Sequence, residues 1–143
     1  LQAKKPLKST SLMSFKEIAV GDHSFQEKEK PIRLKDLIEN PLISLGQGST
    51  TYEFYSKFFL ENDLVLSPDT EVETIDQVLP LIMNGLGIGF LPELFVRPVI
   101  EEGKVCQIPL KENIPEREIC LVENHTFPPS IAAEMFKKML VLK

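Results

Sequence analysis

Apolar and polar positions form their clearest pattern between residues 73 and 96, which predicts a helix, a turn, a strand and a second helix. Thr74 and Gln77 have the spacing of a capping box, in which each side chain bonds a backbone N–H at a helix start. An apolar run of helical length follows, and Gly85 stands where a helix end favours a left-handed residue. Residues 88–91 are short, apolar and flanked by breakers, as in a strand covered on both faces. The proline after them suits the first turn of the second helix.

Gly85, Gly87 and Gly89 in this segment have a spacing close to that of a dinucleotide-binding loop. That motif needs a strand before the glycines and a helix after them, so that the helix N-terminus faces the pyrophosphate. Here the helix is expected first and the strand second, and the spacing is G-x-G-x-G. The pattern therefore favours a tight helix-to-strand turn over a nucleotide site.

The remaining chain continues to alternate predicted strands and helices. Apolar or alternating runs predict strands at residues 15–20, 42–45, 70–74, 104–110 and 117–123. Thr50 and Glu53 have the spacing of a second capping box, which would begin an aromatic-rich helix. A helix near the C-terminus would carry one apolar face of Ile131, Ala132, Met135, Phe136, Met139 and Leu140. This alternation favours an α/β fold with a mixed, mostly parallel sheet and helices on both faces.

Composition narrows the function classes. The chain has 143 residues, 43% of them hydrophobic and 26% charged, which is typical of one globular domain. A net charge of −5 argues against nucleic-acid binding by this chain, since phosphates are neutralised by basic surfaces. No apolar run approaches a membrane span, and no secretory leader is visible. Cys106 and Cys120 lie in apolar runs, so we expect buried, reduced thiols of a cytoplasmic protein, with a disulfide as the less favoured alternative.

These elements, in this order, resemble the effector-binding domain of LysR-type transcriptional regulators over residues 6–140. The resemblance rests on KPLKSTSLMSFKEIAVGDHSF with its Asp22-His23 pair, LKDLIENPLISLGQGST, NGLGIGFLPELFV, GKVCQIPL and PEREICLVENH, followed by the terminal helix. It implies a fold like that of type 2 periplasmic binding proteins, in which a small effector lies between two lobes. It also implies a cytoplasmic regulator that switches by lobe closure and dimer rearrangement.

The resemblance further implies a division of the chain. Residues 1–16 would be a remnant of lobe one and the entry to lobe two, residues 17–110 would be lobe two, and residues 111–143 would be the strand and C-terminal helix that return toward lobe one. The winged helix-turn-helix, the linker helix and the first βαβ unit of lobe one have no counterpart in this sequence. DNA would therefore be contacted through a domain outside this chain.

Two apolar surfaces suggest self-association. Met135, Phe136 and Met139 would face a core that this sequence lacks, so their helix should fold onto lobe two, dimerise or swap between chains. The aromatic-rich helix carries more rings than one buried face needs, namely Phe54, Tyr55, Phe58 and Phe59. We therefore expect a homodimer or higher oligomer, with association through the aromatic-rich helix.

The turn at residues 46–50 is the predicted effector site. Its glycines let a ligand approach the backbone, and the helix that follows presents free N–H groups with a partial positive charge. The hydroxyls of Ser49 and Thr50 would add donors, so an anionic group such as a carboxylate is the natural ligand. The helix start at Thr74 is a second site of this kind, and capping by Thr50 and Thr74 is compatible with ligand contact. The predicted ligand-binding residues are Gln47, Gly48, Ser49, Thr50 and Thr74.

Catalytic and metal chemistry find little support. The turn at residues 48–49 lacks the second glycine of a nucleophile elbow, and His23 and His125 have no metal-ligand spacing. Glu71 and Glu73 lie on one strand face, which is more typical of a solvated edge than of an acid/base pair. We expect no catalytic residue, metal, cofactor or membrane contact. The alternatives to a sensor are a solute-binding receptor of a transport system and, less favoured, an enzyme on the same two-lobed fold.

Overall fold

The structure, a computed structural model, describes residues 6–25 and 30–141, and the chain divides into two compact units. The larger unit, here called the sheet unit, comprises Lys16–Pro115. The smaller, here called the ribbon unit, comprises Leu1–Phe15 and Glu116–Lys143, of which the structure describes residues 6–15 and 116–141. Lobe assignments for residues 1–16, 17–110 and 111–143 remain a prediction, and residues 1–5 and 142–143 lie outside the described part.

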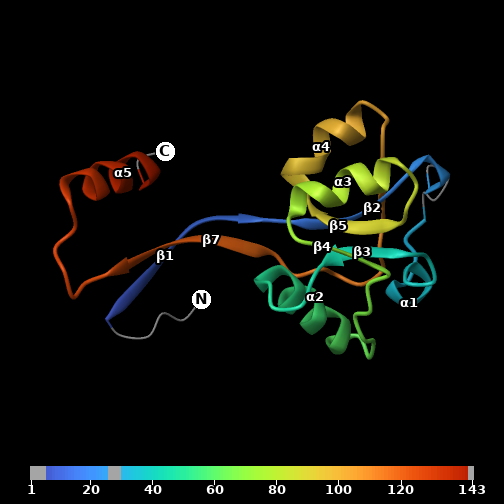
Figure 1. Cartoon of the computed structure of the whole chain (residues 1–143), viewed down its shortest axis with the longest axis horizontal. Helices are drawn as coiled ribbons and strands as arrows, with labels where there is room; N and C mark the ends of the chain where they lie inside the picture. Colours follow the sequence, from blue (N-terminus) through green and yellow to red (C-terminus); the bar gives the residue numbers. More distant parts are fainter. Residues whose placement is uncertain (1–5, 26–29, 142–143) are drawn as a thin grey trace. The chain divides into compact units, whose positions relative to one another are not determined.

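A five-stranded sheet in the order β4-β3-β5-β2-β6 forms the centre of the sheet unit (Figure 1). Its strands are β2 (Glu17–Gly21), β3 (Leu42–Leu45), β4 (Thr70–Val72), β5 (Ile88–Pro92) and β6 (Cys106–Ile108). β3 runs parallel to β4 and β5, whereas β2 runs antiparallel to β5 and β6. The predicted mixed sheet is confirmed, but parallel pairings are two of the four and not the majority.

Helices cover both faces of this sheet, as predicted. They are α1 (Leu34–Leu37), α2 (Thr50–Glu61), α3 (Ile75–Met83) and α4 (Glu93–Glu101), with a 3-10 turn η1 (His23–Phe25) after β2. Figure 1 shows α1 and α2 on one side of the sheet and α3 and α4 on the other. Successive side chains of β3 point to opposite faces of the sheet. Leu42 belongs to the same core cluster as Phe59 of α2, and Ile43 belongs to the same cluster as Val78 of α3.

The glycine-rich turn has the predicted order of helix, turn and strand. Gly85 ends α3 with φ at +72°, and the Leu86 N–H returns to the Leu81 carbonyl at 3.1 Å. This is the left-handed helix ending that glycine adopts without steric cost. β5 (Ile88–Pro92) follows the turn and itself contains Gly89, so the glycines lead into a strand and not directly into a helix N-terminus. Pro92 closes β5 and precedes the first residue of α4, one position earlier than predicted.

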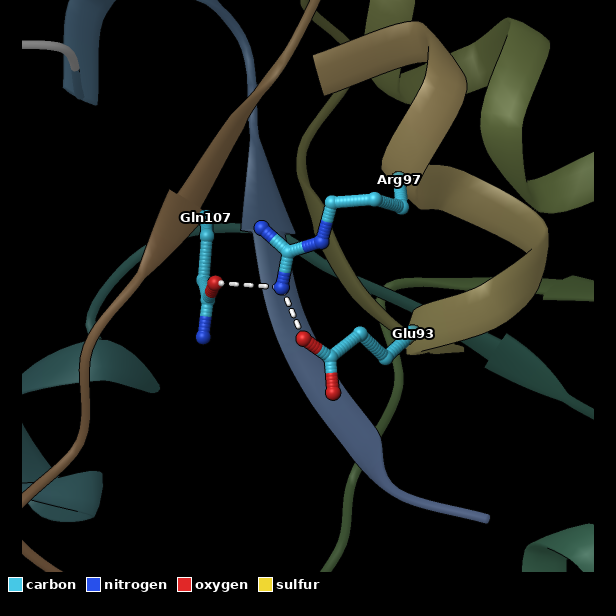
Figure 2. A network of polar contacts seen from close by, with 3 residues as sticks. All are labelled: Glu93, Arg97 and Gln107. Atoms are coloured by element: carbon cyan, nitrogen blue, oxygen red, sulfur yellow. Dashed lines mark hydrogen bonds and ion pairs between the residues drawn. The ribbon is translucent and has the colours of Figure 1, made fainter. Parts of the chain in front are cut away.

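α4 is joined to the edge strand β6 by a side-chain network (Figure 2). Arg97 pairs with Glu93 one turn earlier in the helix, and Arg97 Nη2 lies 3.5 Å from Oε1 of Gln107 in β6. α4 contains Pro98 and continues past it to Glu101. Each such exposed contact contributes only about 0.3–0.5 kcal/mol, so the network orients α4 more than it stabilises it.

The aromatic residues of α2 belong to the core of the sheet unit. Tyr55, Phe58 and Phe59 are buried, and Phe54 packs against the same cluster. Phe90 of β5 contacts two of these rings, with centroid distances of 4.9 Å to Tyr55 and 6.0 Å to Phe59. The surplus of aromatic residues is therefore used within the unit, and the reason for expecting association through α2 does not hold.

The ribbon unit consists of β1 (Leu7–Phe15), β7 (Arg117–Asn124) and α5 (Ile131–Val141). β1 and β7 form an antiparallel pair, and Lys137 of α5 bonds Glu123 of β7 at 2.8 Å. No residue in the described elements of this unit is buried; Ile131 is 80% exposed and Met139 is 68% exposed. The apolar face predicted for the C-terminal helix thus remains on the surface. Without buried residues in these elements, the unit lacks a core of its own, and an isolated two-stranded ribbon is only marginally stable in water.

Candidate functional site

The predicted ligand residues lie at one edge of the sheet. β3 and β4 are parallel, so their carboxyl ends meet at the same edge, and α2 and α3 begin there. Ligands of open α/β sheets bind outside the carboxyl ends of the strands. Residues 47–50 precede or begin α2, and Thr74 precedes α3. The two helix starts share this edge, although their helices cover opposite faces of the sheet.

Ser49, not Thr50, is the N-cap of α2, so the predicted Thr50–Glu53 capping box is wrong. Ser49 has an extended backbone, and its Oγ accepts a hydrogen bond from the Tyr52 N–H at 3.0 Å. The same hydroxyl donates to the Gly46 carbonyl at 3.1 Å. Because a hydroxyl has one hydrogen, Ser49 offers a ligand only an acceptor lone pair. Among the described residues the Thr50 N–H has no hydrogen-bond partner, so it is one donor available to a ligand.

The backbone of this turn is open. Gln47 and Gly48 are exposed, and Gly48 has φ at +91° with no atom within 4 Å of the position of a Cβ. A positive φ is strained for other residues, which explains glycine here. The open backbone agrees with the predicted close approach of a ligand.

A carboxylate that the sequence did not point to lies beside the turn. A Cβ on Gly46 would stand 3.2 Å from Oε2 of Glu71, which lies in β4 opposite Ser44 of β3. Glu53 is a second carboxylate, in the first turn of α2. The helix dipole supplies about half a positive charge at this end, and the two carboxylates oppose it. Glu71 was visible only as a strand-edge residue, because its proximity to Gly46 depends on strand register.

Thr74 and Gln77 form the predicted capping box at the start of α3. Its best-defined part is Gln77 Oε1, which accepts from the N–H groups of Thr74 at 3.2 Å and Glu73 at 3.0 Å. A shallow depression beside it is lined by Glu71, Val72, Glu73, Asp76, Gln77, Pro80 and Leu81. This lining contains three carboxylates and no basic residue, so an anion is less favoured at Thr74 than at the start of α2.

Two titratable groups elsewhere in the described part of the sheet unit have shifted pKa values, and neither belongs to an evident catalytic pair. Two hydrogen bonds from Ser24, at 2.6 Å from its Oγ and 2.9 Å from its N–H, lower the pKa of Asp22. Burial, and then the nearby Asp22 charge, raise the pKa of the Cys106 thiol, which favours its unreactive protonated form. Cys106 and Cys120 are both free, but they are half-buried where buried thiols were predicted.

In residues 6–25 and 30–141, no group of three His, Cys, Asp or Glu residues is arranged to hold a metal ion. Within the same ranges, none of the helices has the length and apolar character needed to cross a membrane.

Comparisons with known proteins give a consistent picture. A family model described as the LysR substrate binding domain matches residues 5–142. The chain is 29% identical over 100 residues to the HTH-type transcriptional regulator YwqM of Bacillus subtilis (strain 168), an alignment that covers 70% of this chain and 33% of that protein. It is 36% identical over 64 residues to the HTH-type transcriptional activator CmpR of Synechocystis sp. (strain ATCC 27184 / PCC 6803 / Kazusa), covering 45% of this chain and 21% of the relative. The chain thus spans about a third or less of these relatives.

Solved structures agree on the fold. The effector binding domain of QuiR in complex with shikimate has a TM-score of 0.81 at 18% identity, covering 99% of this chain and 67% of that chain. The regulatory domain of CcmR from Synechocystis PCC6803 in complex with 2-PG has a TM-score of 0.82 at 14% identity, covering 99% and 69%. At these identities the likeness establishes the fold and leaves the ligand of this chain to be argued from its own residues.

Proposed function

Since the chain belongs to the LysR substrate-binding-domain family, we propose that it is the effector-sensing part of a transcriptional regulator. A small molecule binds it and changes how the whole protein binds DNA, through a domain outside this chain. Support comes from the match over residues 5–142 and from two relatives that are HTH-type regulators. The transport-receptor alternative has no comparable support among these relatives.

The effector site of this proposal is the sheet edge at the start of α2. Gln47, Gly48, Ser49 and Thr50 form it, with Thr74 at the same edge as a weaker contributor. The observation that carries the assignment is the open turn at Gly48, next to a helix N-terminus whose Thr50 N–H has no partner among the described residues. Backbone N–H groups at a helix start favour an anionic group on the ligand. Shikimate, which accompanies QuiR, is such a molecule, a carboxylate with three hydroxyls.

The wider features of the proposal concern the whole protein. It acts in the cytoplasm as a homodimer or higher oligomer, and it needs no metal or other cofactor and catalyses no reaction. Residues 17–110 form lobe two, and residues 1–16 and 111–143 belong to the entry and return segments toward lobe one. The exposed apolar face of α5 is consistent with a segment that packs against further protein.

A backbone substitution at the helix start tests the site. Thr50→Pro removes the N–H at the first helical position, where proline is well tolerated and where Ser49 already has the extended backbone that precedes proline. Thr50→Ala is the matched control, because it keeps the N–H and removes only the side chain. We would titrate the ¹⁵N-labelled chain with shikimate and follow the amide signals of residues 46–51.

We expect Thr50→Pro to weaken binding about tenfold or more, since a hydrogen bond to a charged group contributes about 1.5–3 kcal/mol. Thr50→Ala should change the dissociation constant less than threefold or so, because a side chain on an exposed edge contributes little. If both variants bind like the parent, the effector does not contact this helix start and the site is misassigned.

A further inference from the structure

We propose that Glu71 determines which effectors the site accepts. It selects a molecule that carries a hydrogen-bond donor, a hydroxyl or an ammonium group, beside its anionic group, and it rejects a molecule with a second anionic group there. This inference rests on the proposed function, because it assigns chemistry to the effector site at the start of α2.

Strand register places the Glu71 carboxylate at that site. Glu71 pairs directly with Ser44, and the ladder continues to the Gly46 N–H, which bonds the Val72 carbonyl at 3.2 Å. Directly paired residues project to the same face of a sheet, and residues two apart in a strand do so too. Glu71, Ser44 and Gly46 therefore share the face of Leu42, which packs in the same core cluster as α2. The 3.2 Å between Glu71 Oε2 and the Cβ position of Gly46 places the carboxylate beside the glycine.

At this edge, a hydrogen-bond donor and an acceptor that a ligand could use come from different residues, Thr50 and Glu71. The Thr50 N–H remains as a donor for an anionic group, and the Ser49 hydroxyl hydrogen is already bonded to Gly46. An ionised glutamate only accepts hydrogen bonds, so Glu71 offers a ligand no donor. Among the ion pairs of the described residues none involves Glu71, so its charge is not neutralised by a neighbouring lysine or arginine.

Binding of an effector strengthens the preference of Glu71 for a hydrogen-bond donor over a second anionic group. The exposed Glu71 is well hydrated in the free chain, but a ligand over the turn displaces that water and strengthens the local field. A second carboxylate would then stand near Glu71 and Glu53 without compensation, which is unfavourable for both charges. A hydroxyl or ammonium group in the same place would donate to Glu71 in a charge-assisted hydrogen bond.

A competing explanation is that Glu71 only prevents the outermost strand, β4, from pairing with other chains. β4 is the outermost strand of the sheet beside β3, and charged side chains on edge strands discourage pairing with other chains. An edge charge of that kind would leave ligand selectivity unchanged, so selectivity is the quantity to measure.

The experiment uses four probes with one four-carbon skeleton: butyrate, 4-hydroxybutyrate, 4-aminobutyrate and succinate. Each has the same carboxylate at one end, and only the other end changes, from methyl to hydroxyl, ammonium or carboxylate. Dissociation constants come from the amide signals of residues 46–51 in the ¹⁵N-labelled 143-residue chain. The variant is Glu71→Gln, and the control is Glu61→Gln, which makes the same charge change at the exposed far end of α2.

The parent chain should bind 4-hydroxybutyrate and 4-aminobutyrate more tightly than butyrate, and succinate most weakly. Glu71→Gln should reduce the ratio of the succinate and 4-aminobutyrate dissociation constants about tenfold, by losing both an attraction and a repulsion. Glu61→Gln should leave that ratio as in the parent.

An unchanged ratio in Glu71→Gln, with binding that is still sensitive to Thr50→Pro, overturns this inference and leaves the proposed function standing. If no probe shifts the amide signals of residues 46–51, the proposed site is wrong and the inference fails with it.

Discussion

Substitution of Gly87 tests whether the glycine-rich turn needs a residue without a side chain in order to pack closely against the backbone of Pro41. A Cβ at this position would lie 2.4 Å from the Pro41 carbonyl oxygen and 3.1 Å from its carbon. That carbonyl cannot turn away, because it accepts the Ile88 N–H at 2.9 Å and directly precedes β3. Gly87→Ala therefore forces the first pairing of β3 with β5, between Leu42 and Ile88, to open.

The magnitude follows from this contact. Relieving a 2.4 Å approach to an ordinary van der Waals distance requires a shift of about 1 Å in a rigid backbone. Overpacking of this kind costs about 1–3 kcal/mol, and losing the hydrogen bond from Ile88 to Pro41 costs about 1 kcal/mol more. We expect Gly87→Ala to lower the free energy of unfolding by about 3 kcal/mol. For a chain of this size, the melting temperature should fall by about 10 °C.

Thermal and urea unfolding followed by circular dichroism measures this difference. Gly48→Ala is the matched control, because Gly48 has a positive φ of +91° but open space around its Cβ position. Only the backbone conformation is penalised there, by about 1–2 kcal/mol. The steric reasoning is refuted if Gly87→Ala unfolds at the same temperature as Gly48→Ala or above it.

Three further substitutions test the core, the corrected cap and a titrating group. Phe59→Ala removes a fully buried ring from the α2 core and should lower the free energy of unfolding in urea by about 3–5 kcal/mol, so a loss below 1 kcal/mol or so would contradict that placement. Ser49→Ala should cost about 1 kcal/mol in the same assay and Thr50→Ala only a few tenths, and the reverse order would restore Thr50 as the cap. Because hydrogen bonds from Ser24 lower the pKa of folded Asp22, they stabilise the fold above the unfolded pKa of Asp22, and this contribution is lost as the pH falls through the folded pKa. Ser24→Ala should raise the pKa of Asp22 toward its usual value in a carbon-detected NMR titration, and an unchanged pKa would reject the cause.

Much of the fold was predictable because its signals are local. The capping box at Thr74, the left-handed end at Gly85 and β3 each depend on residues within one turn or one strand. Of β1 (Leu7–Phe15), only the last residue fell within a predicted strand. The rest was missed because its sequence has no strict alternation and because its pairing partner, β7, lies far along the chain. The share of parallel pairs was overestimated for the same reason, because β2 joins β5 and β6 by long-range antiparallel pairing.

Some features of the candidate site were likewise predictable from the sequence, and others were not. The open turn and the helix start at residues 47–50 were predicted from composition and spacing. Ser49 and Thr50 are both good capping residues, and the backbone conformation together with the bond from Ser49 to Gly46 decided between them. The proximity of Glu71 to Gly46 required the register of two strands that are separated by the whole of α2.

Short-range patterns in the sequence are enough to indicate the family, the order of the central helices and strands, and the turn where a ligand is expected. The folded structure is needed to see which hydroxyl is already bonded, which N–H is available and which carboxylate stands beside the turn. The position of the Glu71 carboxylate depends on strand register, which arises only when segments distant in sequence pack together. The bonded hydroxyl and the available N–H depend on the backbone conformation of the turn, in which neighbouring groups compete for the same hydrogen-bond partners.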